Sequence, residues 1–260
     1  MSRKEIKINN QPISYLEFEP QKEKPRGCFL ILHGWGSKSE KWEQVGNLLS
    51  ETGFGVIVPD LPGFGESSDL TIPWSLDNFA DLIDKFTDFL KIEKFYLLGH
   101  SFGGSLAIKC SLKFPYKIEK MFLVASSGIR KKTLKKRCLF FVSKIFKIFS
   151  FLPFYQFFRK AFYKFIIKKT DYVNIKNNIL KETFLKIIQE DLTDLMEYVS
   201  LPTIIIWGNK DDFTSIKDAY LMNKKIANSK LIIIQDADHY LYRKMPEILV
   251  KNIKQNIIER

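Results

Sequence analysis

The segment that decides the fold reads FYLLGHSFGG at residues 95–104. It opens with an apolar run, and an amphipathic pattern follows from Phe102 to Lys113, so a strand, a sharp turn and a helix are expected in that order. The turn carries the G-x-S-x-G pattern at residues 99–103, in which a strained backbone projects the hydroxyl of Ser101 and the glycines let helix and strand approach closely. A chance match in a glycine-serine loop is the alternative, which the strand-turn-helix context disfavours. Ser101 is therefore the predicted nucleophile.

Strands and helices alternate on both sides of this segment. Nearly continuous apolar runs are typical of strands buried on both faces, and they occur at Cys28–Leu32, Phe54–Val58, Phe95–Leu98, Met121–Ala125, Thr203–Trp207 and Leu231–Ile234. Helical periodicity occurs at Lys41–Glu51, Leu76–Lys91, Phe102–Lys113, Ile216–Ile226 and Pro246–Ile258. Residues 6–9 and 13–19 alternate apolar and polar and predict an antiparallel hairpin at one edge. The pattern predicts an α/β fold with a mostly parallel, eight-stranded sheet and helices on both faces.

One long region does not alternate. Between about residues 129 and 200 the sequence has no convincing buried strand but a helical series dense in Lys, Arg and Phe. We interpret residues 129–200 as a helical lid inserted between an N-terminal part of the core at 1–128 and a C-terminal part at 201–260. A chain of 260 residues is long enough to bury one core of this kind, so a single catalytic domain with an insertion is expected.

A serine hydroxyl needs a neighbouring base to accept its proton, and the chain has three histidines. His33 ends a predicted strand and is interpreted as structural. His100 directly precedes Ser101, which points its side chain away from the hydroxyl. His239 follows the last predicted strand, where a loop can carry it over the carboxyl edge of the sheet. A solvated surface histidine is the alternative for His239, which we expect to be the general base.

A carboxylate must orient this imidazole and stabilise its protonated form. The sequence WGNKDD at residues 207–212 ends a predicted strand and offers Asp211 and Asp212 as candidates. Either of them gives the chain order serine, aspartate, histidine. This order differs from those of the chymotrypsin and subtilisin triads.

Two N–H groups are expected to bind the oxyanion that develops on the substrate. One is the backbone N–H of Phe102, at the start of a helix. The other is that of Trp35 in the sequence HGWG at residues 33–36, where Gly34 and Gly36 permit a tight turn. A plain glycine-rich turn is the alternative for this loop.

Five motifs in order resemble the α/β-hydrolase superfamily, in particular its lidded carboxylesterases and its carbon-carbon hydrolases of the meta-cleavage type. These motifs are HGWG at 33–36, DLPGFGES at 60–67, GHSFG at 99–103, WGNKD at 207–211 and DADH at 236–239. The resemblance favours Asp211 over Asp212 as the acid of a triad with Ser101 and His239, and it implies the same two oxyanion donors. Asp236 stands where the family has a glycine, which leaves the shape of that loop open. The scaffold motifs are similar to those of the pimeloyl-carrier-protein methyl esterases.

The predicted lid is rich in cations and phenylalanines. Basic residues cluster at 130–137, and a helix over 154–168 would place Phe158 and Phe162 on one face and lysines on another. We expect the phenylalanine face to bind the apolar acyl part of a substrate and the cations to meet an acidic partner, such as acyl carrier protein, or an anionic membrane surface. A solvated lysine face over a core-facing aromatic stripe is the alternative.

The formal net charge of +12 attracts anionic partners, but it does not indicate which class of partner binds. Nucleic acid is not expected, because the sequence has no RNA-binding signature and no zinc-ligand spacing. Residues 1–10 lack the hydrophobic centre of a secretory signal, so a cytoplasmic location is expected. No uncharged stretch is long enough to span a bilayer.

These expectations describe a serine hydrolase that cleaves a carboxylic ester or thioester through an acyl-enzyme on Ser101. Neither a metal nor an organic cofactor is expected. Two alternatives stay open at this point. The same three residues can hydrolyse a carbon-carbon bond, and the scaffold can serve as a non-catalytic binder of a ligand or a lipid surface.

Overall fold

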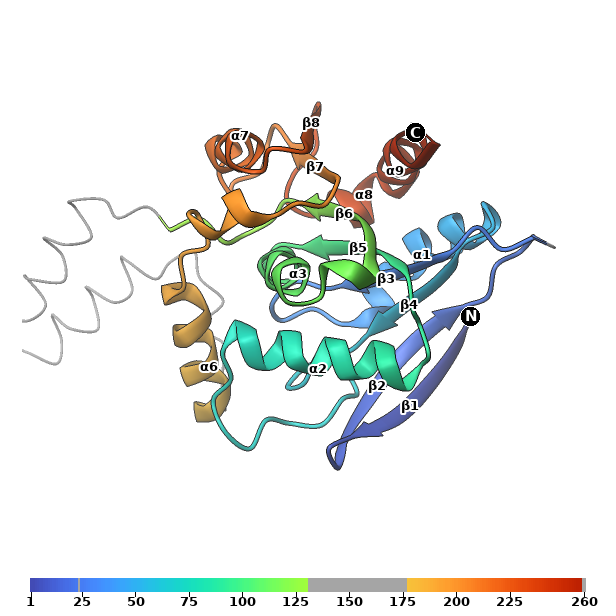
Figure 1. The fold of residues 1–260 in the computed structure, drawn as a ribbon, viewed down its shortest axis with the longest axis vertical. Coiled ribbons are helices and arrows are strands. Elements are labelled where there is room, and N and C mark those ends of the chain that lie inside the picture. The colour runs from blue at the N-terminus through green and yellow to red at the C-terminus, as the bar shows by residue number, and fades with distance from the viewer. Residues whose placement is uncertain (23, 131–176, 259–260) are drawn as a thin grey trace, which may run out of the picture.

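The computed structural model describes residues 1–22, 24–130 and 177–258. In these ranges a single sheet lies between two layers of helices (Figure 1). The sheet has eight strands in the order β1-β2-β4-β3-β5-β6-β7-β8. The first two are antiparallel to their neighbours, and the others pair in parallel. The predicted fold class is therefore confirmed.

Every predicted strand is present, with ends that shift by a few residues. The strands are β1 (Ser2–Ile8), β2 (Gln11–Phe18), β3 (Cys28–Leu32), β4 (Gly55–Pro59), β5 (Phe95–His100), β6 (Ile118–Val124), β7 (Thr203–Gly208) and β8 (Ser229–Ile234). The hairpin of β1 and β2 turns at Asn9 and Asn10, whose φ angles are 52° and 64°. Asparagine tolerates this left-handed conformation, and two such residues match the turn type that suits a two-residue hairpin.

The helices follow the predicted pattern, with additions. They are α1 (Glu43–Glu51), α2 (Leu76–Phe89), α3 (Phe102–Lys113), α6 (Asn178–Gln189), α7 (Ile216–Lys225), α8 (Leu241–Lys244) and α9 (Pro246–Ile258). The helix predicted from Lys41 begins instead at Glu43, because a 3-10 turn at Ser39–Trp42 precedes it. None of the helices in the described ranges combines the length and the apolar character needed to cross a bilayer.

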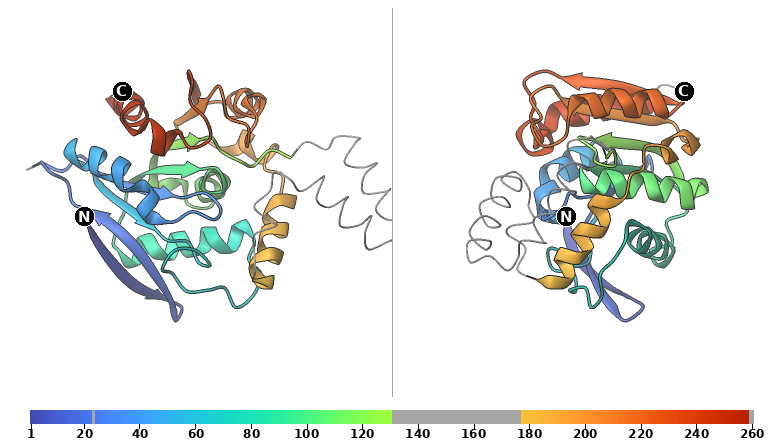
Figure 2. Two further views of the ribbon diagram at one scale, coloured as in Figure 1. Left: turned by 180° about the vertical axis from the view of Figure 1, so that it is seen from behind. Right: turned by 90° about the vertical axis from the view of Figure 1, so that its left-hand side faces the viewer.

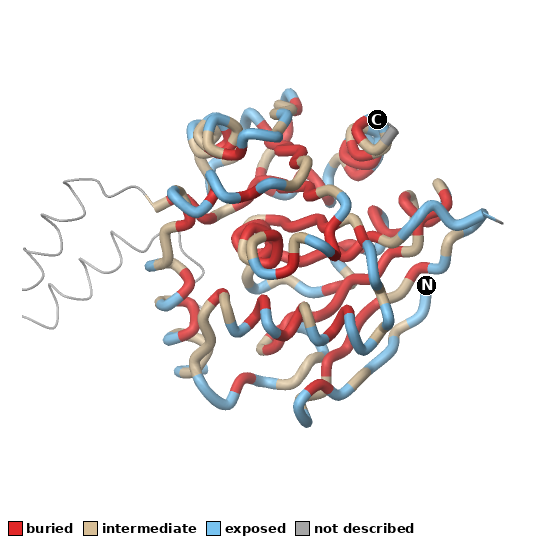
Figure 3. The backbone as a smooth tube through the Cα atoms, viewed as in Figure 1, coloured by how far each residue is buried: buried red, intermediate tan, exposed pale blue. Residues whose placement is uncertain are grey.

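Both faces of the sheet are buried, because successive side chains of each central strand enter different cores. In β3, Leu30 and Leu32 pack with α2, α3 and α7, whereas Phe29 and Ile31 pack with α1, α8 and α9. Figure 3 shows this buried interior along the central strands, while the β1 edge is mostly exposed. The near-continuous apolar runs of the sequence therefore have a direct structural cause.

Helix α6 belongs to the predicted lid and lies at one end of the sheet (Figures 1 and 2). It is joined to the loop after β4, since the N–H of Trp74 donates to Thr183 Oγ1 at 3.1 Å and Lys186 Nζ donates to the carbonyl of Pro73 at 2.9 Å. Most of the predicted lid, including Phe158 and Phe162, lies outside the described residues. The lid at 129–200 and the two-part core stay predictions.

Candidate active site

Ser101 lies in the turn between β5 and α3. Its backbone has φ 52° and ψ −115°, a strained conformation for a residue with a side chain. Its N–H donates to the carbonyl of Val124 at 3.1 Å, and its own carbonyl accepts from the N–H groups of Ser127 at 3.0 Å and Gly104 at 2.9 Å. Bonds from the end of β6 and the loop after it therefore hold this turn.

The glycines around Ser101 have a steric role. A Cβ on Gly99 would lie under 3.0 Å from the carbonyl of Gly103, and a Cβ on Gly103 would lie under 3.0 Å from the carbonyl of Leu32. Backbone atoms cannot turn aside as a flexible side chain can. Glycine at both positions is therefore what lets α3 begin so close to β3 and β5.

His239 and Asp211 form a buried pair at the carboxyl ends of β8 and β7. His239 Nδ1 lies 2.9 Å from Asp211 Oδ2, and the two side chains are 8% and 0% exposed. An ionised carboxylate only accepts hydrogen bonds, so Nδ1 carries the proton of the neutral ring and Nε2 keeps its lone pair. A general base needs this tautomer.

Backbone and hydroxyl donors fix the Asp211 carboxylate. Oδ1 accepts from the N–H groups of Phe213 and Thr214, both at 2.8 Å, and Oδ2 accepts from the Thr214 hydroxyl at 2.7 Å. Burial acts to raise the pKa of Asp211, but hydrogen bonds from His239 and Thr214 and the charge of His239 outweigh it, so the pKa is lowered. Asp212 is exposed, and the structure brings Asp211 to the imidazole.

Two residues that contact this pair, Phe213 and Thr214, were not predicted from the sequence. The ring of Phe213 stacks on the imidazole of His239, with centroids 5.0 Å apart and an angle of 29° between the planes. The hydroxyl of Thr214 lies 3.4 Å from His239 Nδ1 as well as contacting Asp211. A turn in which an aspartate accepts from the backbone two and three residues later is a recognisable signal, and it starts at Asp211.

His100 is also a neighbour of the His239–Asp211 pair, and its ring is buried. His100 Nε2 lies 2.9 Å from the backbone carbonyl of His239, which can only accept, so Nε2 carries the proton. Burial is the main cause that lowers the pKa of His100 to about 3, so the ring is neutral. It joins β5 to the loop that carries the predicted base.

His33 has the structural place that the sequence predicted for it. The N–H of Leu61 donates to His33 Nε2 at 3.0 Å, so Nδ1 carries the proton and donates to the carbonyl of Gly34 at 2.8 Å. The ring is fully buried, and burial lowers its pKa. His33 thus joins the HGWG loop to the loop after β4.

The two predicted oxyanion donors lie beside the serine. The HGWG loop passes next to it, since a Cβ built on Gly34 would lie 3.4 Å from Ser101 Cβ. Gly36 has φ +67°, a left-handed conformation that glycine adopts freely. Phe102 is the first residue of α3, where a helical N–H has no partner within the helix. Trp35 and Phe102 line one cavity with Ser101.

Asp60 of the DLPGFGES motif joins the loop after β4 to the 3-10 turn before α1 and to β1. Its side chain is fully buried, and its oxygens accept from the N–H of Ser39 at 2.6 Å, the N–H of Glu66 at 3.0 Å and the Arg3 guanidinium at 3.1 Å. A Cβ on Gly65 would collide with this carboxylate. Asp60 therefore helps to position the site, while Phe64 of the same motif lines the cavity with Ser101.

A cavity of about 960 Å³ opens at the carboxyl ends of the strands. Ser101, His239, Trp35 and Phe102 all contribute to its lining, and α6 supplies an apolar wall. Within the described ranges the Ser101 hydroxyl makes no hydrogen bond with His239; catalytic bonds of this kind commonly tighten only when substrate binds. The carboxyl edge of a parallel sheet is where α/β folds generally bind ligands.

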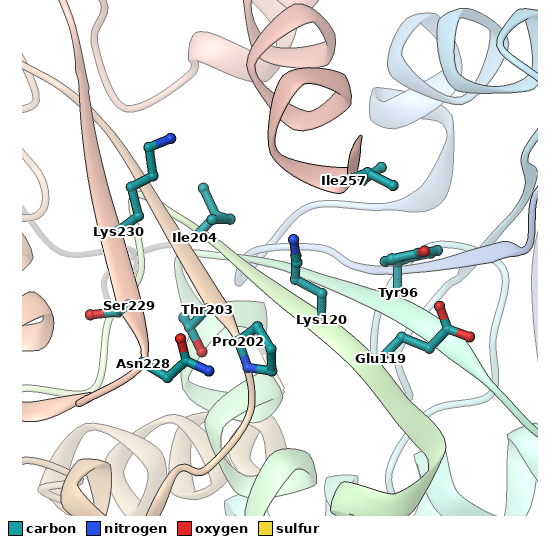
Figure 4. Close-up of a pocket in the computed structure, with 10 residues that line it drawn as sticks. All are labelled: Tyr96, Glu119, Lys120, Pro202, Thr203, Ile204, Asn228, Ser229, Lys230 and Ile257. Carbon is teal, nitrogen blue, oxygen red and sulfur yellow. The ribbon is translucent and has the colours of Figure 1, made fainter. Parts of the chain in front are cut away.

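A second hollow of about 500 Å³ lies at the opposite edge, where β5 to β8 begin. Figure 4 shows its lining side chains, among them Lys120, Thr203 and Ser229. The hydroxyls of Thr203 and Ser229 donate to the backbone carbonyls of Leu201 and Ile226, at 3.0 and 2.7 Å. We therefore find no candidate nucleophile among the described residues of this hollow.

Metal ligation has no candidate in the part of the chain that the structure describes. No three His, Cys, Asp or Glu side chains gather there in a way that could hold an ion. The absence of a cofactor stays an expectation from the sequence.

Comparison with known proteins agrees with this fold. A family model described as alpha/beta hydrolase fold matches residues 27–146. The chain is 28% identical over 249 residues to "Putative esterase/lipase 2" of Mycoplasma genitalium, covering 90% of each, and 25% identical over 233 residues to "Lipase 1" of Psychrobacter immobilis, covering 81% of this chain and 70% of that one. The solved esterase of Exiguobacterium antarcticum superposes with a TM-score of 0.74 at 20% identity, covering 96% of this chain and 97% of the other.

The fold, the family model and the relatives together place the chain in the α/β-hydrolase superfamily. The resemblance predicted from five motifs is confirmed at this level, and the chain is a hydrolase of the α/β fold.

Proposed function

We propose that the protein is a serine hydrolase of carboxylic esters or thioesters, with Ser101 as nucleophile, His239 as base and Asp211 as the orienting acid. One observation carries the proposal. The buried Asp211 carboxylate holds His239 at 2.9 Å in the tautomer that leaves Nε2 free to accept a proton, while His239 and Ser101 line the same cavity. The names of the lipase and esterase relatives support ester bonds as the substrate.

The mechanism follows from these positions. His239 Nε2 accepts the proton of Ser101 as Oγ attacks the substrate carbonyl, and the N–H groups of Trp35 and Phe102 receive the oxyanion. His239 then donates this proton to the leaving oxygen or sulfur, which releases the alcohol or thiol and leaves an acyl-serine. In the second half, water gives a proton to His239 and attacks the acyl carbon. The serine recovers the proton as the acid leaves.

Fewer observations support the other parts of the prediction. An apolar acyl part suits the α6 wall of the cavity, where Leu180, Phe184 and Ile187 contribute to the lining. Binding of acyl carrier protein or an anionic membrane at the basic lid stays a prediction, because Phe158, Phe162 and the lysines around them lie outside the described residues. A cytoplasmic location also stays a prediction.

Active-site labelling tests the proposal. A fluorophosphonate probe should label the wild-type protein and a Ser200→Ala control, since Ser200 is exposed and outside the cavity. Ser101→Ala should abolish labelling and the hydrolysis of p-nitrophenyl esters. Labelling that persists in Ser101→Ala refutes the assignment. Tight ligand binding without turnover of any ester would favour the non-catalytic binder instead.

A further inference from the structure

The catalytic cavity has two walls of different chemistry. One is apolar: Leu180, Phe184, Ile187 and Ile188 of α6 line it. The indole of Trp35 continues this wall, with its ring centroid 5.0 Å from that of Phe184. The apolar wall is therefore continuous with the loop that carries a proposed oxyanion donor.

The other wall is cationic. Lys38 directly precedes the 3-10 turn before α1, and Lys41 belongs to this turn. Arg243 lies on α8. Lys41 and Arg243 also share a neighbouring hollow with Tyr242, so they lie close to one another. None of the described residues that line the catalytic cavity is an aspartate or a glutamate.

Two cations of this wall make no ion pair with the acidic residues that the structure describes. Glu40 is bound by Arg3 and by Lys38, so Lys38 is already paired. Glu40 and Glu43 line the neighbouring hollow together with Lys41 and Arg243, and neither of them lines the catalytic cavity. Among the described residues, neither Lys41 nor Arg243 has an ion pair.

The fourth cation of the lining belongs to the other side of the cavity. Arg130 donates from Nη2 to the carbonyl of Ile187 at 3.3 Å, and its backbone N–H donates to Asp191 at 3.3 Å. Burial is the main cause that lowers its pKa, and nearby carboxylates including Asp191 oppose this effect. Arg130 is therefore held at α6 and is not part of the cationic wall.

The position of the base decides which part of a substrate meets each wall. His239 must protonate the leaving group, so the alcohol lies on the side of His239, and the chain continues from there directly into α8 with Arg243. The acyl chain then extends past Trp35 toward α6.

We propose that the natural substrate is an ester of an apolar acid with an alcohol that carries an anionic group, carboxylate or phosphate, which Lys41 and Arg243 bind. This inference rests on the serine-hydrolase function proposed above. The apolar and charged ends of such an amphiphile match the two walls, and the ester bond falls between them at Ser101.

A matched pair of chromogenic esters tests the inference. The substrates 4-nitro-3-(octanoyloxy)benzoate and 2-nitrophenyl octanoate share the acyl chain and the nitrophenol and differ by one carboxylate on the alcohol. Wild type should favour the anionic ester in kcat/KM by about tenfold at low salt, and the preference should shrink as salt screens the charges. The double variant Lys41→Gln/Arg243→Gln should lose this preference and cleave the two esters with similar kcat/KM.

A control variant and a second substrate pair complete the test. Lys251→Gln removes an exposed cation on α9 outside the cavity and should change neither rate. The charge reversal Lys41→Glu/Arg243→Glu should make the neutral ester the better substrate. Octanoylglycerol phosphate against octanoylglycerol repeats the comparison with phosphate as the anion.

The outcomes separate the two proposals. A wild-type preference that is absent, or that survives the double substitution, overturns the inference while ester hydrolysis stands. Failure to cleave either ester, together with no labelling of Ser101 by fluorophosphonate, overturns the serine-hydrolase function itself.

Discussion

Asp211 is the most consequential buried charge of the site. Because its carboxylate fixes the tautomer of His239, Asp211→Asn presents an amide that favours the opposite tautomer. We expect kcat to fall by about three to four orders of magnitude while the fold is retained, since the amide keeps the shape of the carboxyl group. Steady-state kinetics with a p-nitrophenyl ester measures this loss. A variant that keeps more than a tenth of the activity would assign the role of acid to another group.

The same residue links stability to pH. Its folded-state pKa is lowered from an ordinary value of 3.8, so below this value the unfolded chain takes up the proton first. The stability that the ionised carboxylate contributes is thus present above pH 3.8 and is lost as pH falls through the lower folded-state pKa. We expect the difference in free energy of unfolding between wild type and Asp211→Asn to shrink on acidification. Urea unfolding across the acidic range measures it, and a widening difference contradicts the prediction.

His100 is a positioning residue in this description. Its Nε2–H donates to the carbonyl of His239, and its uncharged state persists across the working range because burial lowers its pKa to about 3. We expect His100→Leu to lower kcat by about tenfold to a hundredfold through misplacement of the base, with KM little changed. His100→Gln places an amide donor near Nε2 and should restore much of kcat. Equal losses in both variants, matched by equal losses of Tm, would indicate packing alone.

At the scale of elements, the approach of α3 to β3 depends on the absence of one methyl group. Gly103→Ala sets a Cβ against the carbonyl of Leu32, and we expect it to lower the free energy of unfolding by about 3 kcal/mol or more. Gly36→Ala is the matched control, because its φ is +67° but no atom lies within 4 Å of an added Cβ. Only the strain of a left-handed residue remains there, about 1 kcal/mol. Denaturant unfolding measures the loss in free energy of unfolding for both variants. Equal losses would contradict the steric explanation.

The elements themselves were largely predictable, because each central strand is a short apolar run closed by a loop with polar residues. Ser101, Asp211 and His239 each follow such a run, and parallel strands bring their carboxyl ends to one edge. The bond from His100 to the His239 carbonyl was not predictable. It joins residues 139 apart in the chain, and nothing local to either of them indicates which surface they share.

At the scale of the whole molecule, the net charge was predictable from the sequence but its location was not. A net charge of +12 was evident, and the lid was its expected location. The cations that line the described cavity include Lys41 and Arg243, which stand near the two ends of the chain and lie outside any motif. Their meeting depends on the sheet order, which places α1, α8 and α9 on one face. The periodicity of a sequence does not indicate which residues far apart in the chain become neighbours in the fold.

His239 follows β8, which is one of the two edge strands of the sheet, and the side chains of β8 are less buried than those of β7. An edge strand can detach while its neighbours keep their hydrogen bonds, since local opening requires less free energy than global unfolding. On heating, the protein should therefore lose its activity at a lower temperature than the one at which it unfolds globally. We expect the loss of activity to precede the loss of circular dichroism, with amide exchange in 229–239 faster than in 203–208. Coincident transitions and uniform exchange would show that β8 opens only with the rest.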